Sequence, residues 1–118
     1  MAKVAPEIRI EPNPRRVVVT VHGRTIADTR RALALGVPGT PADQYIPRED
    51  VDMTALRRTA HRTHCPYKGD AAYYTIEVAG RVAENAVWTY ETPRPGVAAI
   101  RDHLAFYRDR VDAIEERD

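Results

Sequence analysis

The segment 64–69 combines the residue types best suited to chemistry. Its sequence is His-Cys-Pro-Tyr-Lys-Gly, and it holds the only cysteine of the chain, Cys65, and one of the two lysines, Lys68. A cysteine thiolate is a nucleophile, and a lysine ammonium is a compact charge whose pKa responds to its surroundings. Because arginine supplies nearly every other cation in the chain, a lysine at position 68 indicates a requirement that arginine does not meet.

A tight turn would bring the two reactive groups together. Proline at the second position of the segment 65–68 suits a type I or type II turn, in which the first and fourth Cα atoms lie within about 7 Å. A nearby ammonium favours the thiolate form of a cysteine, and the adjacent His64 could supply a base. We therefore predict Cys65 and Lys68 as candidate catalytic residues, with a buried, inert cysteine as the alternative.

Other side chains could bind a ligand. Asp28 and Arg30 are two positions apart on an expected strand, so their side chains lie on one face, where they could hold a carboxylate or phosphate or instead form a structural cross-strand ion pair. Aromatic residues could line a pocket above the turn, although on strands half of such a set simply belongs to the core. The predicted ligand-binding residues are Asp28, Arg30, Tyr45, Tyr73 and Trp88.

The cysteine and histidine content predicts neither a bound metal nor a cofactor. His61, His64 and Cys65 lack a matching downstream pair of ligands, and a single cysteine excludes both an internal disulfide and a Cys-x-x-Cys zinc motif. The sequence also lacks a glycine-rich phosphate loop, a serine nucleophile elbow and a paired-carboxylate signature.

Length and composition predict one globular domain. The chain has 118 residues, of which 43% are hydrophobic and 30% charged, and its formal net charge is +1. These values are typical of folded domains, and the near-neutral charge argues against a nucleic-acid partner. The sequence has no apolar stretch long enough to cross a bilayer, and its first residues lack the apolar core of a signal peptide. We therefore expect no membrane association and a cytoplasmic location.

The elements that must position the candidate residues are mostly strands. Residues alternate between two faces over 17–21, 72–78 and 86–90, a period of two that predicts strands with one buried face. Residues 25–29 are expected to form a hairpin with 17–21, and short strands are expected at 44–46 and about 103–108. A short helix is expected after Pro47, and a loop over 80–85. Residues 30–35 and 56–63 stay undecided, and 111–114 could extend the last strand or form a short helix.

These elements predict a mainly β single domain over residues 16–118, preceded by an N-terminal arm over residues 1–15. The arm contains three prolines and a short edge strand at 7–10. The antiparallel sheets are expected to form two packed layers or a curled, barrel-like sheet, with short connecting helices. The exposed edge of the arm would allow a homodimer to form by strand pairing.

Six segments in combination resemble a known family. They are 26–33, 45–47, 50–51, 65–69, 85–88 and 105–107. Together they resemble the domain-of-unknown-function family 427, a family of small bacterial and fungal proteins, over about residues 16–114. The resemblance implies a β-tent fold, akin to that of certain zinc-binding and sulfoxide-reducing proteins, although zinc need not accompany it in a chain without a Cys-x-x-Cys pair. It implies no particular reaction, and its characteristic positions are Asp28, Thr29, Arg30, Tyr45, Cys65, Lys68, Gly69, Tyr73 and Trp88.

We therefore expect a protein that binds a small anionic molecule in a pocket around the turn at 65–68. Arg30 and Lys68 would hold the anion, Tyr45 and Trp88 would supply apolar walls, and Cys65 or Lys68 would provide any enzymatic reactivity. The alternative is a non-catalytic structural or protein-interaction module, in which the same motifs only shape turns and pair strands.

Overall fold

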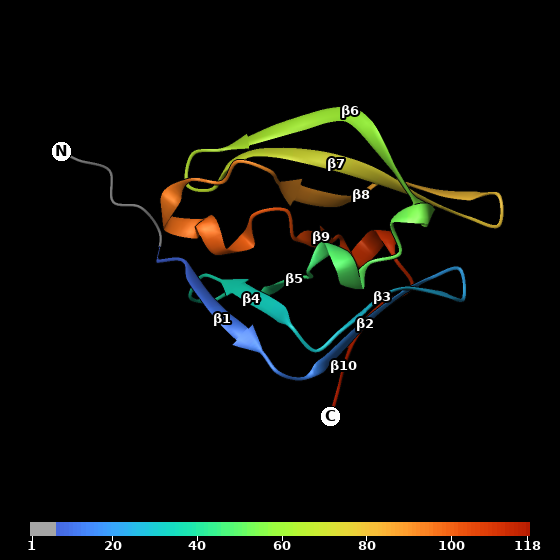
Figure 1. Ribbon diagram of the computed structural model, residues 1–118, viewed down its shortest axis with the longest axis horizontal. Helices are drawn as coiled ribbons and strands as arrows, with labels where there is room; N and C mark the ends of the chain where they lie inside the picture. The colour runs from blue at the N-terminus through green and yellow to red at the C-terminus, as the bar shows by residue number, and fades with distance from the viewer. Residues whose placement is uncertain (1–6) are drawn as a thin grey trace.

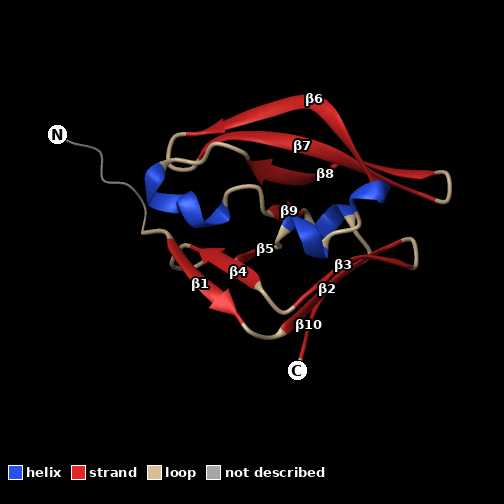
Figure 2. Cartoon of the chain, in the orientation of Figure 1, coloured by secondary structure: helices blue, strands red, loops and turns tan. Residues whose placement is uncertain are grey.

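The computed structural model describes residues 7–118, and strands dominate this part of the chain (Figures 1 and 2). The strands are β1 (Arg9–Asn13), β2 (Arg16–Val21), β3 (Arg24–Thr29), β4 (Ala32–Gly36), β5 (Asp43–Tyr45), β6 (Leu56–Cys65), β7 (Gly69–Val78), β8 (Arg81–Tyr90), β9 (Leu104–Phe106) and β10 (Ala113–Arg117). Four short 3-10 helices connect strands within the described residues: η1 (Arg48–Asp50), η2 (Met53–Ala55), η3 (Pro95–Ile100) and η4 (Arg108–Arg110). None of these helical segments is long or apolar enough to span a membrane.

The strands of residues 7–118 form three antiparallel sheets. One has the strand order β6-β7-β8-β9, the second β1-β4-β5 and the third β10-β2-β3. Figure 1 shows the four-stranded sheet along one side of the molecule and the two three-stranded sheets along the other. The prediction of a mainly β domain with antiparallel sheets and short connecting helices is confirmed, and the sheets in the described chain do not close into a barrel.

Apolar side chains fill the space between the sheets in two clusters. The first lies between the β2–β3 hairpin and the β7–β8 hairpin and includes the fully buried Val19, Ile26 and Ile76. The second lies between β5 and the other end of β7 and β8, and it includes Tyr45 and Trp88. Burial of these side chains is the main stabilising contribution to the fold, because each removes a large apolar area from water.

Backbone hydrogen bonds join β5 to the four-stranded sheet. Directly after β5, the N–H of Ile46 donates to the carbonyl of Leu104 at 2.8 Å, and the N–H of Leu104 donates to the carbonyl of Ile46 at 2.8 Å. This antiparallel bridge fixes the end of β5 beside β9. As a result, Tyr45 of β5 contacts Trp88 of the neighbouring strand β8.

Two tight turns have a common geometry. His22 and Gly23 connect β2 to β3, and Ala79 and Gly80 connect β7 to β8, with positive φ at all four residues. Two-residue turns of this kind match the right-handed twist of antiparallel strands. The predicted hairpin at His22 is therefore confirmed.

The predicted loop over 80–85 is wrong. After the turn at Gly80 the chain re-enters the sheet at once, and β8 begins at Arg81. The polar Asn85 lies at an irregular position within β8, with φ of +48°, and its backbone N–H donates to the hydroxyl of Thr75 at 3.0 Å. Asparagine tolerates this left-handed conformation, so it marks a bulge here and not the end of a loop.

The undecided segments are strands. Residues 56–63 belong to β6, and most of 30–35 belongs to β4. The last expected strand, over about 103–108, is limited to β9, and β10 is a separate strand that pairs with β2. Strand β1 lies within the expected arm, at the edge of the sheet that it forms with β4.

Gly69 shapes the start of β7. Its φ is +114°, a backbone conformation that L side chains rarely adopt, and a Cβ at this position would lie 3.3 Å from the carbonyl oxygen of Thr92. Glycine is therefore required at the point where the chain leaves the loop that carries Lys68.

We expect Gly69→Ala to lower the free energy of unfolding by about 1–3 kcal/mol, because it adds backbone strain and crowds the Thr92 carbonyl. Urea denaturation would measure the loss. Gly96→Ala is the matched control, since a Cβ there meets nothing within 4 Å and the backbone is not left-handed. Equal midpoints for the two variants would contradict this account of Gly69.

Candidate functional site

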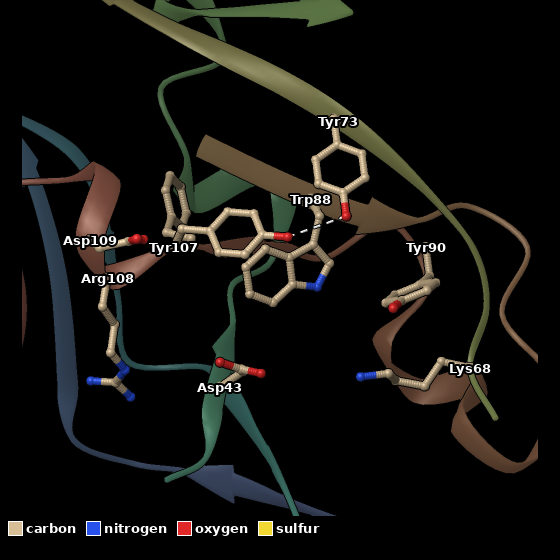
Figure 3. A pocket seen from close by; sticks show the side chains of 9 residues that line it. Asp43, Lys68, Tyr73, Trp88, Tyr90, Tyr107, Arg108 and Asp109 are labelled. Atoms are coloured by element: carbon tan, nitrogen blue, oxygen red, sulfur yellow. Dashed lines mark hydrogen bonds between the residues drawn. The ribbon is translucent and has the colours of Figure 1, made fainter. Parts of the chain in front are cut away.

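A cavity of about 440 Å³ lies between β5 and the four-stranded sheet (Figure 3). Its size is within the range of small-molecule sites in proteins. Five aromatic side chains from β7, β8, β9 and the residue after β9 line it: Tyr73, Trp88, Tyr90, Phe106 and Tyr107. Four charged side chains lie among or beside them: Asp43, Lys68, Arg108 and Asp109.

The aromatic rings hold one another in place. The indole N–H of Trp88 donates to the hydroxyl of Tyr45 at 3.0 Å, and Tyr45 is fully buried behind the pocket. The ring centroids of Trp88 and Tyr107 are 4.6 Å apart, and Tyr73 stacks on Tyr107 at 6.4 Å with an angle of 9° between the planes. Aromatic pairs at these separations stabilise each other, so the ring surface is largely pre-formed.

Two phenol groups form a short hydrogen-bonded chain into the cavity. The hydroxyl of Tyr73 lies 2.9 Å from the hydroxyl of Thr63 and 3.3 Å from that of Tyr107. Burial raises the pKa of Tyr107 to about 12, and the hydrogen bond with Tyr73 acts in the same direction. Tyr107 therefore stays protonated at neutral pH, and its hydroxyl is available to donate or accept a hydrogen bond.

Asp43 places a carboxylate in the pocket. Burial raises the pKa of Asp43, while the positive charges of Lys68 and Arg108 partly offset that rise. Figure 3 shows these two cations on opposite sides of the Asp43 carboxyl group, with the Trp88 indole across the cavity from it. Within residues 7–118 the carboxyl group forms neither an ion pair nor a hydrogen bond.

Lys68 extends into the pocket from the loop between β6 and β7. Its backbone carbonyl accepts a hydrogen bond from the N–H of Arg94 at 2.9 Å, which fixes the loop against the segment after β8. The ammonium nitrogen lies 5.7 Å from the ring centroid of Tyr90, a cation–π contact. No carboxylate of the described chain forms an ion pair with this ammonium. On the other side of the pocket, the guanidinium of Arg108 donates to the carbonyl of Ala42 at 2.9 Å.

The structure brings together three of the predicted site residues, Lys68, Tyr73 and Trp88. Tyr45 lies directly behind them and contacts the pocket through its hydrogen bond to Trp88. Cys65 does not line the cavity. It is half-buried and pairs with Gly69 at the end of the β6–β7 hairpin. Burial is the larger cause of the raised pKa of the pocket residue Tyr90, and Cys65 lies close enough to that phenol to contribute to the rise.

Asp28 and Arg30 do not lie at this pocket. The carboxylate of Asp28 accepts hydrogen bonds of 2.9 and 2.6 Å from the guanidinium of Arg16 on the neighbouring strand, and these bonds lower the pKa of Asp28. This is the cross-strand ion pair that the sequence left open as an alternative. Arg30 is exposed, and its guanidinium lies 3.5 Å from the backbone carbonyl of Asp118.

Sequence reasoning missed Asp43 and Arg108. A signal for Asp43 existed, because it lies two residues before Tyr45 and therefore shares its strand face. Arg108 follows β9 in a short helical turn, and no pattern distinguishes it from the other exposed arginines.

The histidines are used in local contacts. His61 packs on the ring of Tyr73 with centroids 4.5 Å apart, and a ring nitrogen of His64 lies 2.7 Å from the carboxylate of Asp70. Over residues 7–118, no group of three or more histidine, cysteine, aspartate or glutamate side chains is arranged to hold a metal ion.

A family model described as a domain of unknown function (DUF427) matches residues 9–117, which is nearly the whole chain. No curated protein matches the chain. The match includes every residue that lines the pocket.

The raised pKa of Asp43 predicts a pH-dependent stability. In the window between the ordinary carboxyl pKa and the raised one, the folded state binds more protons than the unfolded state, so stability falls as pH rises. We expect Asp43→Asn to raise the thermal unfolding midpoint at pH 7, with a gain that shrinks as pH is lowered through this window. Thermal melts at a series of pH values would measure it. Asp109→Asn, at the exposed rim, is the control, and a destabilised or pH-insensitive Asp43→Asn variant would contradict the expectation.

Proposed function

We propose that this chain, which belongs to the domain of unknown function family DUF427, binds a small organic anion with a flat or apolar portion in the pocket between β5 and β8. The observation that supports this most directly is the Lys68 ammonium, which extends into an aromatic-lined cavity without an ion-pair partner in residues 7–118.

Lys68 differs from many arginines of the chain because it has no ion-pair partner within residues 7–118. By contrast, Arg16, Arg31 and Arg58 form ion pairs with Asp28, Asp50 and Glu91, respectively. Their charges are neutralised locally, whereas the charge of Lys68 is available to a ligand. Arg108 adds a second cation at the opposite side of the pocket. An anionic group in the cavity would therefore gain charge-assisted hydrogen bonds from one or both cations.

The aromatic rings favour an organic ligand over a simple inorganic ion. Tyr107 is half-buried and Trp88 is 8% exposed, and a flat group placed against these two rings would remove the part of their apolar surface that still contacts water. The hydroxyl of Tyr107 supplies a polar contact at the same wall. A few polar groups on a mostly apolar wall are typical of small-molecule sites.

Lys68 is the group that would carry covalent chemistry in this pocket. The thiol of Cys65 lies outside the lining, so a ligand seated on the rings would meet the amine before the sulfur. An amine can attack a carbonyl carbon when it is deprotonated. The proposal of binding does not depend on such a step.

We expect Lys68→Ala to weaken binding of aromatic carboxylates and nucleoside monophosphates by about ten-fold or more, because it removes a charge-assisted contact. Ligand-induced shifts of the thermal unfolding midpoint would give the affinities. Lys68→Arg retains the positive charge and should keep part of the affinity.

Arg30→Ala is the matched control, since Arg30 is an exposed cation outside the pocket. It should bind every anion as the wild type does. The proposal fails if no anion in the panel stabilises the wild type, or if Lys68→Ala and wild type show equal shifts.

A further inference from the structure

The carboxylate of Asp43 makes the pocket a poor match for a simple anion. It is half-buried and has no hydrogen-bond or ion-pair partner in the described chain, so it retains its full capacity to accept hydrogen bonds. A negative charge beside a bound anion would repel it and would weaken the attraction of Lys68 and Arg108. A ligand with a positively charged group would turn this repulsion into an attraction.

The four charged side chains that line the pocket have a formal net charge of zero. Asp43 and Asp109 are negative, and Lys68 and Arg108 are positive. Burial raises the pKa of Asp43 and the positive charge of Lys68 partly offsets that rise, yet the two groups do not form an ion pair in residues 7–118. A neutral lining with separated charges is complementary to a ligand that is neutral overall and carries both charges at separate positions.

The aromatic rings favour a cation on the Asp43 side of the cavity. In Figure 3 the Trp88 indole lies across the cavity from the Asp43 carboxyl group, and the ring of Tyr107 lies against Trp88. Ring faces attract ammonium groups, most strongly those of tryptophan. A carboxylate opposite an aromatic wall is therefore a suitable place for a ligand ammonium, and the anionic end of the same ligand would lie toward Lys68.

We infer that the ligand is a small zwitterion with an aromatic or other apolar side group. Its ammonium contacts Asp43, its anionic group contacts Lys68, and its side group packs on Trp88 and Tyr107. This assignment rests on the proposed function, because it names the class of anion that the pocket holds. A polyphosphate fits less well, since the lining has no net positive charge to neutralise it.

Two series of compounds with matched skeletons would test the assignment. The first is L-phenylalanine, phenylpropanoate and phenylethylamine, and the second is L-tryptophan, indolepropanoate and tryptamine. In each series the second compound lacks the ammonium and the third lacks the carboxylate. Isothermal titration calorimetry of the whole chain should show tightest binding for a zwitterion, by about ten-fold over the matched anion and the matched amine.

Asp43→Asn provides the second readout. It removes the negative charge while it preserves the shape of the side chain, so it should abolish the preference for the zwitterion over the matched anion. Binding of the anion itself should be unchanged or tighter, because the repulsion is gone. Asp102→Asn is the matched control, and it should leave the preference intact because Asp102 is exposed and lies outside the lining of this pocket.

The outcomes separate this inference from the proposal on which it rests. If the matched anions bind the wild type as tightly as the zwitterions, or if Asp43→Asn keeps the preference, the zwitterion is overturned while an anion site stands. If the amines bind tightest, both the zwitterion assignment and the proposed anion-binding function are overturned. If neither series binds, the zwitterion assignment fails, and the wider anion panel with Lys68→Ala decides the proposed function.

Discussion

The hydrogen bond from the Trp88 indole to the Tyr45 hydroxyl is the interaction on which the pocket depends. The two rings meet edge to face at 6.1 Å, and both side chains are almost fully removed from solvent. The Ile46–Leu104 bridge directly after β5 adds two backbone hydrogen bonds to the same junction. Together these contacts fix β5 against β8 and β9, and this placement brings Asp43 opposite Trp88. A buried donor that loses its acceptor costs about 1–3 kcal/mol, so the junction resists rearrangement.

The second constraint is that the charges of the pocket are kept apart. Elsewhere the protein pairs its ions, as in Arg16 with Asp28 and Arg58 with Glu91. In the pocket, Asp43 and Lys68 remain unpaired although each lies within the field of the other. Partly buried charges without partners reduce stability, and such groups concentrate at sites that bind ligands. Gly69, with a φ of +114° that glycine adopts readily, carries the chain away from Lys68 at the edge of this pocket.

Much of the fold could be predicted because it follows from local patterns. Alternation in 17–21 and 72–78 indicated strands, and His22-Gly23 indicated a tight turn. The extension of β8 back to Arg81 could not be predicted, because Asn85 is a residue typical of loops. Its place in a bulge depends on hydrogen bonds with Thr59, Thr75 and Arg110, which are distant in the sequence. Strand β6 was undecided for a similar reason, since most of its side chains are exposed and show no apolar period.

The lining of the candidate pocket was predicted in part. The unusual lysine indicated Lys68, and the strand aromatics indicated Tyr73 and Trp88. The partners of these residues depend on which sheets face each other, and local sequence carries little information on that. Asp28 illustrates the point, because the sequence left both a ligand contact and a cross-strand ion pair open, and the register of β2 and β3 places Arg16 within hydrogen-bond distance of it. Asp43 and Arg108 come together only through the junction of β5 with β9.

The most direct test of the central claim is to locate bound small molecules by NMR. Because the chain has one tryptophan, its indole N–H gives one assignable signal that reports on the pocket. A library of small aromatic acids and zwitterions would be titrated into the ¹⁵N-labelled protein. The account predicts that compounds that bind shift the Trp88 indole signal together with the backbone amides of Asp43 and Lys68. Binding that leaves these three signals unchanged, with shifts confined to other surfaces such as the hollow beside β1 and β4, would contradict it.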